Sequence, residues 1–179
     1  PCMNCAVNLS PAQFMHGDVV GLVHSILIET GLAPGRLELE ITEGVLIEDF
    51  DRGLALLRRL KALGVRISMD DFGSGYSSLS YLQAFPFDKI KIDRAFVINL
   101  GRNPQSASIV RAVIGLGHGM EMSIVAEGVE TQEQLAFLAD AGCDAVQGYF
   151  LGKPLPIGQY AALVGRNPGD TMEPARKTG

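Results

Sequence analysis

Strand-like and helix-like segments alternate along the whole of this 179-residue chain. Six segments have the apolar character of buried strands, at residues 6–10, 36–43, 65–71, 87–93, 122–128 and 145–150. Segments with helical periodicity are found at 19–30, 50–63, 77–83, 106–116 and 131–141, and a brief helix is predicted at about 159–164. Because parallel strands need crossover connections, this order predicts an α/β fold with a parallel sheet.

Polar residues gather near the carboxyl ends of the predicted strands. They are Asn8, Glu40, Asp70, Asp71, Lys91, Glu127 and Gln147. In a (β/α)8 barrel these ends form the mouth of the active site, whereas a doubly wound sheet concentrates its site at one switch point. A polar residue from every strand favours the barrel, and no G-x-G-x-x-G follows the first strand. With six strands of the required eight, we expect an incomplete barrel whose first two strands precede Ala6.

The adjacent carboxylates Asp70 and Asp71 end the third predicted strand, and a loop rich in glycine and serine follows them. Two carboxylates held so close repel each other unless a cation or a shared proton lies between them. The alternative is a helix N-cap, in which aspartate satisfies free backbone N–H groups. The local chemistry leaves a metal site and a cap equally open.

Three other polar residues have both a structural and a functional interpretation. Asn8 offers an amide oxygen as a ligand, or it forms an Asx turn before Pro11. Glu40 belongs either to a solvated strand face or, in a parallel sheet, to a covered face on which it needs a cation. Lys91 has three interpretations: it neutralises Glu40, it holds an oxyanion, or it protects an edge strand.

The composition excludes several classes of protein. Hydrophobic residues make up 47% of the chain, which argues against disorder, and no apolar run approaches the ~20 residues that span a bilayer. The net charge of −5 and the lack of a Lys/Arg cluster argue against binding to a nucleic acid polymer, and no membrane contact is expected from this segment. Cys2 and Cys5 have zinc-like spacing but no second ligand pair, and the odd cysteine count is typical of a reducing, cytoplasmic compartment.

Six motifs occur in the order seen in one known family. They are Val-Asn-Leu-Ser at 7–10, Leu-Glu-Leu-Glu-Ile-Thr-Glu at 37–43, Asp-Asp-Phe-Gly-Ser-Gly-Tyr-Ser-Ser-Leu at 70–79, Lys-Ile-Lys-Ile-Asp at 89–93, Val-Ala-Glu-Gly-Val-Glu-Thr at 125–131 and Gln-Gly-Tyr at 147–149. By these motifs the chain resembles the EAL domain family, bacterial phosphodiesterases that hydrolyse cyclic di-GMP (c-di-GMP). The resemblance extends from about Ala6 to Val164. It implies an EAL domain at residues 1–166, of TIM-like barrel type. The tail at 167–179 is rich in proline, glycine and charged residues, and we expect it to be frayed.

The resemblance also implies a set of site residues and two divalent ions, Mg²⁺ or Mn²⁺. The implied metal ligands are Asn8, Glu40, Asp70, Asp71 and Glu127, with Asp70 bridging the two ions. The implied catalytic residues are Lys91, Glu127, Asp70 and Gln147. Contact with the substrate is implied for Lys91, Gln147 and Asp93, and Glu43 would anchor the loop at 72–80.

The implied reaction opens c-di-GMP to linear pGpG, in a homodimer whose parent protein carries sensory or diguanylate cyclase domains. The Glu-Ala-Leu signature of the family is absent, because it lies on a strand before Ala6, and its glutamate is a metal ligand. We therefore expect the parent to be the active phosphodiesterase, with this chain lacking part of the site. The alternatives are an inactive EAL module that binds c-di-GMP as a receptor or mediates protein–protein regulation, and a purely structural barrel with an acidic mouth.

Overall fold

Six parallel strands form one sheet in which the spatial order of the strands follows the sequence. The computed structural model describes residues 3–47, 49–73, 79–156 and 159. The strands are β1 (Cys5–Asn8), β2 (Leu37–Thr42), β3 (Arg66–Phe72), β4 (Lys89–Ile92), β5 (Ser123–Ala126) and β6 (Ala145–Val146). Each strand pairs in parallel with the next, from β1 at one edge to β6 at the other. The α/β class and the incomplete barrel of six strands are thus confirmed.

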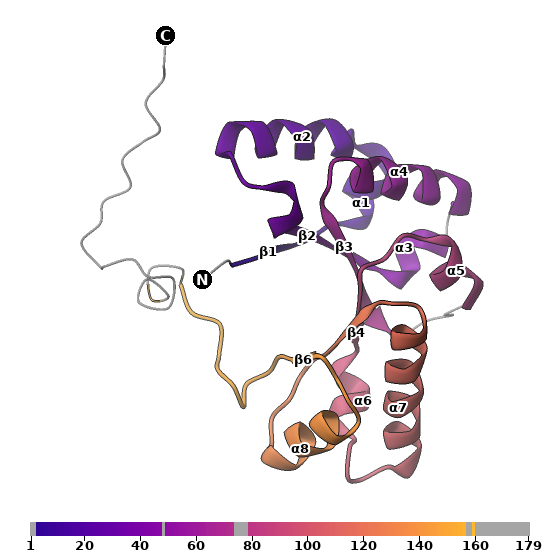
Figure 1. Ribbon diagram of the computed structural model, residues 1–179, viewed down its shortest axis with the longest axis vertical. Helices are drawn as coiled ribbons and strands as arrows, with labels where there is room; N and C mark the ends of the chain where they lie inside the picture. Colours follow the sequence, from indigo (N-terminus) through magenta and orange to yellow (C-terminus); the bar gives the residue numbers. More distant parts are fainter. Residues whose placement is uncertain (1–2, 48, 74–78, 157–158, 160–179) are drawn as a thin grey trace.

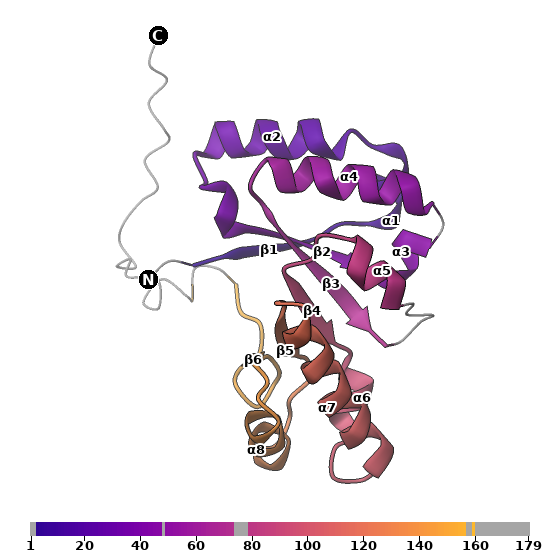
Figure 2. The ribbon, with the colours of Figure 1, turned by 45° about the vertical axis from the view of Figure 1, so that its right-hand side comes forward.

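Helices connect the strands and pack against one face of the sheet (Figure 1). They are α1 (Pro11–His16), α2 (Val19–Thr30), α3 (Glu43–Ile47), α4 (Phe50–Ala62), α5 (Leu79–Ala84), α6 (Arg94–Ile98), α7 (Pro104–Gly119) and α8 (Gln132–Asp140), with a 3₁₀ turn at Pro34–Arg36. Figure 2 shows α2 and α4 side by side over the amino-terminal half of the sheet. The longest helix, α7, packs against β4 and β5.

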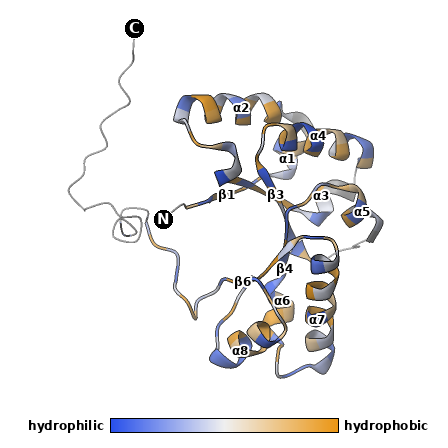
Figure 3. Ribbon diagram, viewed as in Figure 1, coloured by the Kyte–Doolittle hydropathy of each residue, from blue (hydrophilic) through white to orange (hydrophobic). Residues whose placement is uncertain are grey.

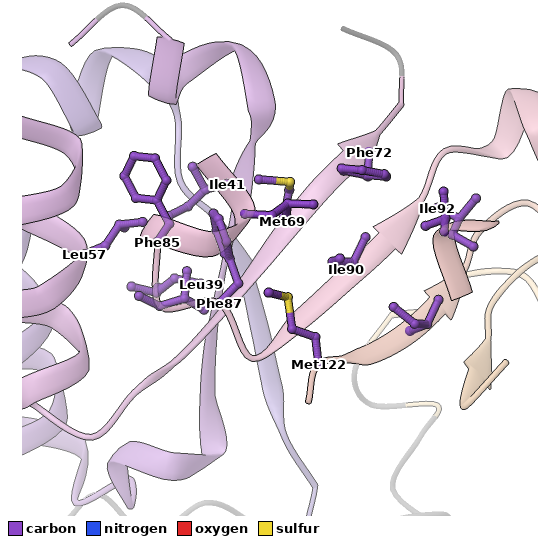
Figure 4. Packing of buried hydrophobic residues seen from close by; sticks show 14 of the residues in the cluster. Leu39, Ile41, Leu57, Met69, Phe72, Phe85, Phe87, Ile90, Ile92 and Met122 are labelled. Atoms are coloured by element: carbon purple, nitrogen blue, oxygen red, sulfur yellow. The ribbon is translucent and has the colours of Figure 1, made fainter. Parts of the chain in front are cut away.

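The sheet has an apolar face and a polar face, because successive side chains of a strand point to opposite sides. On the apolar face, Leu39, Ile41 and Ile90 are buried together with Leu57 of α4 (Figure 4). Figure 3 shows bands of hydrophobic and hydrophilic residues along the helices, as expected for helices that bury one face. The opposite face of the sheet carries the charged residues, so the helical core directs the polar side chains toward the inside of the incomplete barrel.

Two predictions about the strands need correction. Strand β4 lies between β3 and β5, so the interpretation of its lysines as protection of a sheet edge is wrong. The last strand ends at Val146 rather than at residue 150. The chain turns back there, and the backbone at Val129 accepts from Phe150 N and donates to Gln147 O instead of continuing the ladder.

Some features of the helices follow from patterns among neighbouring residues in the sequence. Helix α2 has the predicted bounds, and Thr131 forms a capping box with Gln134 at the start of α8. The described residues contain no helix with the length and apolarity that crossing a membrane requires. Cys2, the brief helix predicted at 159–164 apart from residue 159, the residue-166 boundary and the tail at 167–179 lie outside the described residues.

Candidate active site

A β-bulge in β3 turns two neighbouring carboxylates toward the same side of the sheet. Met69 pairs with Ile90 and Phe72 pairs with Ile92, so β3 has one residue more than β4 between these pairs. The extra residue is accommodated at Asp71, whose φ of 54° is in the left-handed region, and Asp71 N donates to Asp70 Oδ1 at 3.1 Å. Both aspartates are strand residues, so the N-cap interpretation is wrong.

Lys91 lies at the centre of the carboxylate site, and its side chain is only 6% exposed. It comes from the polar face of β4 and reaches carboxylates on three other parts of the sheet. Its Nζ is 2.9 Å from Glu40 Oε2, 2.9 Å from Asp70 Oδ1 and 2.6 Å from Glu127 Oε1. Glu40 belongs to β2 and Asp70 to β3, whereas Glu127 follows β5 directly. One ammonium group therefore gathers three carboxylates from segments far apart in sequence.

The charges of the site are not balanced within it, because one ammonium faces three carboxylates and Asp71 adds a fourth. Burial opposes the charged form of Lys91, but its hydrogen bonds to the carboxylates outweigh burial and raise the pKa of Lys91. Burial also raises the pKa of Glu127, and repulsion by neighbouring carboxylates adds to that rise although Lys91 opposes it. The pKa of Asp71 is raised by burial and then by the charges of Asp70 and Asp93. Additional positive charge would therefore reduce the repulsion among the carboxylates of the site.

Three of these side chains fit a divalent cation. Asp70, Asp71 and Glu127 each offer a carboxylate oxygen, and these oxygens lie within 4.8 Å of one another. Carboxylate oxygens are hard ligands of the kind that Mg²⁺, Mn²⁺ and Ca²⁺ prefer. Glu40 joins the group through its contact with Lys91, and Asn8 on β1 is exposed and in register with Glu40. The roles of all five as metal ligands stay predictions.

Gln147 lies beside the carboxylate site and contacts it directly. Its Nε2 donates to Glu127 Oε1 at 2.7 Å, and its backbone N donates to Ala126 O at 2.9 Å. A cavity of about 820 Å³ adjoins Gln147 and is lined by both charged and apolar side chains, among them Arg94, Glu130, Tyr149 and Leu155. This cavity was not predicted from the sequence, because its walls come from segments that meet only in the folded chain.

Gly148 sets the backbone path next to Gln147. A Cβ at this position would lie 2.1 Å from Val129 O and 2.3 Å from Val129 N, which are backbone atoms held by the hydrogen bonds of the turn. We expect Gly148→Ala to lower the free energy of unfolding by about 1–3 kcal/mol, as measured by urea denaturation. Gly152→Ala is the matched control, because a Cβ there would meet nothing within 4 Å. Equal stability of the two variants would contradict this account.

The two remaining predicted site residues lie at helix starts. Asp93 is the N-cap of α6, and its Oδ1 accepts from Ala95 N at 2.6 Å. Glu43 is 5% exposed and is the first residue of α3, directly after β2. The loop that Glu43 would anchor includes residues 74–78, which lie outside the described residues. The substrate contact of Asp93 and the anchoring role of Glu43 stay predictions.

A second buried ion pair accompanies the carboxylate site and was not predicted. Lys89 Nζ lies 2.5 Å from Glu38 Oε2 and 2.7 Å from Glu38 Oε1. The sequence signal for this pair is its spacing from the first one. Glu38 precedes Glu40 by two residues and Lys89 precedes Lys91 by two, so each residue lies on the same strand face as its counterpart. With Glu38 only 3% exposed, the interpretation of these glutamates as a solvated face is wrong.

Comparison with known proteins gives consistent matches. The family model described as "EAL domain" matches residues 1–154. The bifunctional diguanylate cyclase/cyclic di-GMP phosphodiesterase MucR of Pseudomonas aeruginosa is 47% identical over 161 residues, which are 90% of this chain and 24% of MucR. The chain spans less than a quarter of the length of the curated relatives MucR and an uncharacterized signaling protein of Caulobacter vibrioides.

Two solved structures of similar fold contain bound c-di-GMP, and one of them also contains manganese. The PaMucR phosphodiesterase in complex with c-di-GMP superimposes with a TM-score of 0.84 at 47% identity, over 87% of this chain and 63% of that one. BlrP1 of Klebsiella pneumoniae, in a manganese and c-di-GMP complex at pH 9.0, gives a TM-score of 0.77 at 36% identity, over 82% of this chain and 38% of that one. Both neighbours share the fold of this chain over most of its length.

Proposed function

This chain belongs to the EAL domain family, and from that premise we propose that it forms the metal-dependent site of a phosphodiesterase that hydrolyses c-di-GMP to linear pGpG. The observation that carries the proposal is the gathering of carboxylates from β2, β3 and the end of β5 around Lys91. Such a density of carboxylates is costly unless cations offset it. The c-di-GMP in the PaMucR complex supports the substrate class.

We assign the ion-binding residues as the resemblance implies. Asn8, Glu40 and Asp70 would hold one ion, and Asp70, Asp71 and Glu127 would hold the second, with Mg²⁺ or Mn²⁺ in both positions. The 4.8 Å grouping of the oxygens of Asp70, Asp71 and Glu127 supports the second position. When bound, such ions activate a water molecule and offset the charge that develops on the leaving 3′-oxygen.

The side chains of the chain have separate tasks in this proposal. Lys91 brings a buried positive charge to the place where the phosphate would gain negative charge. Gln147 holds Glu127 in a fixed orientation through its amide hydrogen bond. The adjoining cavity of about 820 Å³ is in the size range of small-molecule sites and combines apolar walls with charged groups such as Arg94.

The wider setting of the domain is also part of the proposal. We assign residues 1–166 to the EAL domain, place it in the cytoplasm and expect it to act as a homodimer. The combination of two activities in MucR supports neighbouring sensory or diguanylate cyclase domains in the parent protein.

The deciding experiment is turnover of c-di-GMP with Mn²⁺, followed by chromatography of the products. It uses both this chain and a form extended toward the N-terminus by the strands that the family carries there. We expect pGpG from the extended form and none after chelation with EDTA. Saturable c-di-GMP binding without product would favour the receptor function instead. Neither binding nor product, in a folded protein, would contradict both functions and leave the structural barrel.

A further inference from the structure

We infer that the buried ion pair of Glu38 and Lys89 is a clamp that positions the carboxylate site, a role that rests on the proposed function of that site. The clamp joins β2 to β4, which are not neighbours in the sheet because β3 lies between them. Lys89 Nζ contacts both carboxylate oxygens of Glu38, at 2.5 and 2.7 Å. The side chain of Glu38 is 4% exposed and that of Lys89 is 23% exposed, so the carboxylate is buried and the contact as a whole is partly buried.

The residue beneath the clamp is small and completely covered. Ser68 of β3 pairs in register with Glu40 on one side and with Lys89 on the other, and its exposure is 0%. Its Oγ is buried and has no hydrogen-bond partner among the described residues. A serine at this point leaves room for the long side chain of Lys89 to cross β3 and reach Glu38, which a larger side chain would obstruct.

The clamp is coupled to the site through the strand period of two. Glu38 and Glu40 are on the same face of β2, and Lys89 and Lys91 are on the same face of β4. Two residues along a strand correspond to about 6.6 Å, so the two ion pairs form successive levels inside the barrel. Glu40 contacts Lys91 at 2.9 Å across β3, as Glu38 contacts Lys89. The first level therefore sets the curvature on which the second depends.

The chemistry of the pair also favours a positioning role over a stabilising one. A buried ion pair is often no more stabilising than well-packed apolar side chains of similar volume. Its directional bonds, however, fix the separation of the two strands that it joins. Lys89 also satisfies Glu38, which would otherwise be an unpaired buried carboxylate able to draw Lys91 away from Glu40.

The test compares Mn²⁺ binding in variants that keep or remove the clamp. Glu38→Gln combined with Lys89→Met removes one charge of each sign and the contact, and we expect about a 10-fold or greater weakening of Mn²⁺ affinity by calorimetry. Lys89→Arg keeps the contact and should stay within about threefold of the unaltered chain. Lys89→Met alone distinguishes the effect of charge from the effect of the clamp. Loss of a nearby positive charge reduces repulsion and so strengthens cation binding, whereas loss of the clamp weakens cation binding.

The matched control removes an ion pair on the outside of the molecule. Arg111→Met combined with Asp140→Asn also deletes one charge of each sign, at an exposed pair whose atoms are 3.1 Å apart. We expect unchanged Mn²⁺ affinity in this control. If the clamp-free variant is folded and binds Mn²⁺ within about twofold of the unaltered chain, or if Lys89→Met binds it more tightly, the clamp is overturned.

A second measurement does not depend on metal. The ammonium group of Lys91, whose side chain is 6% exposed and which contacts three carboxylates, should give protected ¹⁵Nζ–H signals in NMR, assigned by their loss in Lys91→Met. We expect these signals to shift or to exchange rapidly in Lys89→Met and to persist in Lys89→Arg. Persistence in Lys89→Met overturns the clamp. If the signals respond but the unaltered chain binds no Mn²⁺, the clamp stands and the proposed metal site fails.

Discussion

Asp70→Asn is expected to lower the turnover of c-di-GMP by about a thousandfold in the N-terminally extended form, while the fold stays intact. Asp70 is 9% exposed and contacts Lys91 Nζ at 2.9 Å, and its oxygen also belongs to the group that fits a divalent cation. Asparagine has the same shape, but its neutral amide lacks the negative charge that the proposed ligand shared by two cations would supply. It also removes a charge close to Asp71, so repulsion in the site should fall rather than rise.

The measurement for Asp70→Asn combines product formation with Mn²⁺ calorimetry and urea denaturation. Asp140→Asn is the matched control, because its side chain is 73% exposed and its ion pair with Arg111 lies on the outer surface. The control should keep both turnover and Mn²⁺ affinity. Turnover of Asp70→Asn at the rate of the unaltered protein would remove Asp70 from the mechanism, and normal Mn²⁺ binding would remove it from the metal ligands.

Lys91→Met is expected to lower the free energy of unfolding by about 3–5 kcal/mol in the absence of metal, as measured by urea denaturation. Methionine fills a similar volume, but it leaves the carboxylates of Glu40, Asp70 and Glu127 without the ammonium that joins them. Mn²⁺ should restore part of the loss, because a divalent cation supplies the missing charge to the same oxygens. The exposed control Arg111→Met should cost less than about 1 kcal/mol.

The stability lost in Lys91→Met should also depend on pH, and this loss should become smaller as pH falls. Burial already raises the pKa of Glu127 above its ordinary value of 4.5, and removal of Lys91 takes away the main opposing influence. The native state then binds more protons than the unfolded state in the window above 4.5, so stability rises as pH falls through that window. A deficit that grows on acidification, or one that Mn²⁺ leaves unchanged, would contradict this account.

The local patterns of the sequence were sufficient for the order of the strands and of the longer helices, but they did not predict the short helices α1, α3 and α6. Alternation of apolar residues identified β2 and β4, and the 3.6-residue period gave α2 its bounds. Alternation along the strands put Glu40 and Lys91 on the polar side of their own strands, and contact between them was one of the interpretations that the sequence left open. These signals lie within a few residues of the chain, which is why they can be read without knowledge of the fold.

The remaining features of the fold and of the site were decided by pairing between segments that are distant in sequence. The bulge that turns both Asp70 and Asp71 inward depends on the register of β3 against β4, and the early end of β6 depends on hydrogen bonds to Val129. The crossing of Lys89 to Glu38 and the cavity beside Gln147 arise only when the sheet curves. The sequence alone therefore determined which polar groups lie near the carboxyl ends of the strands. The tertiary structure decided which of them touch, because a contact across strands is fixed by register and curvature rather than by neighbours along the chain.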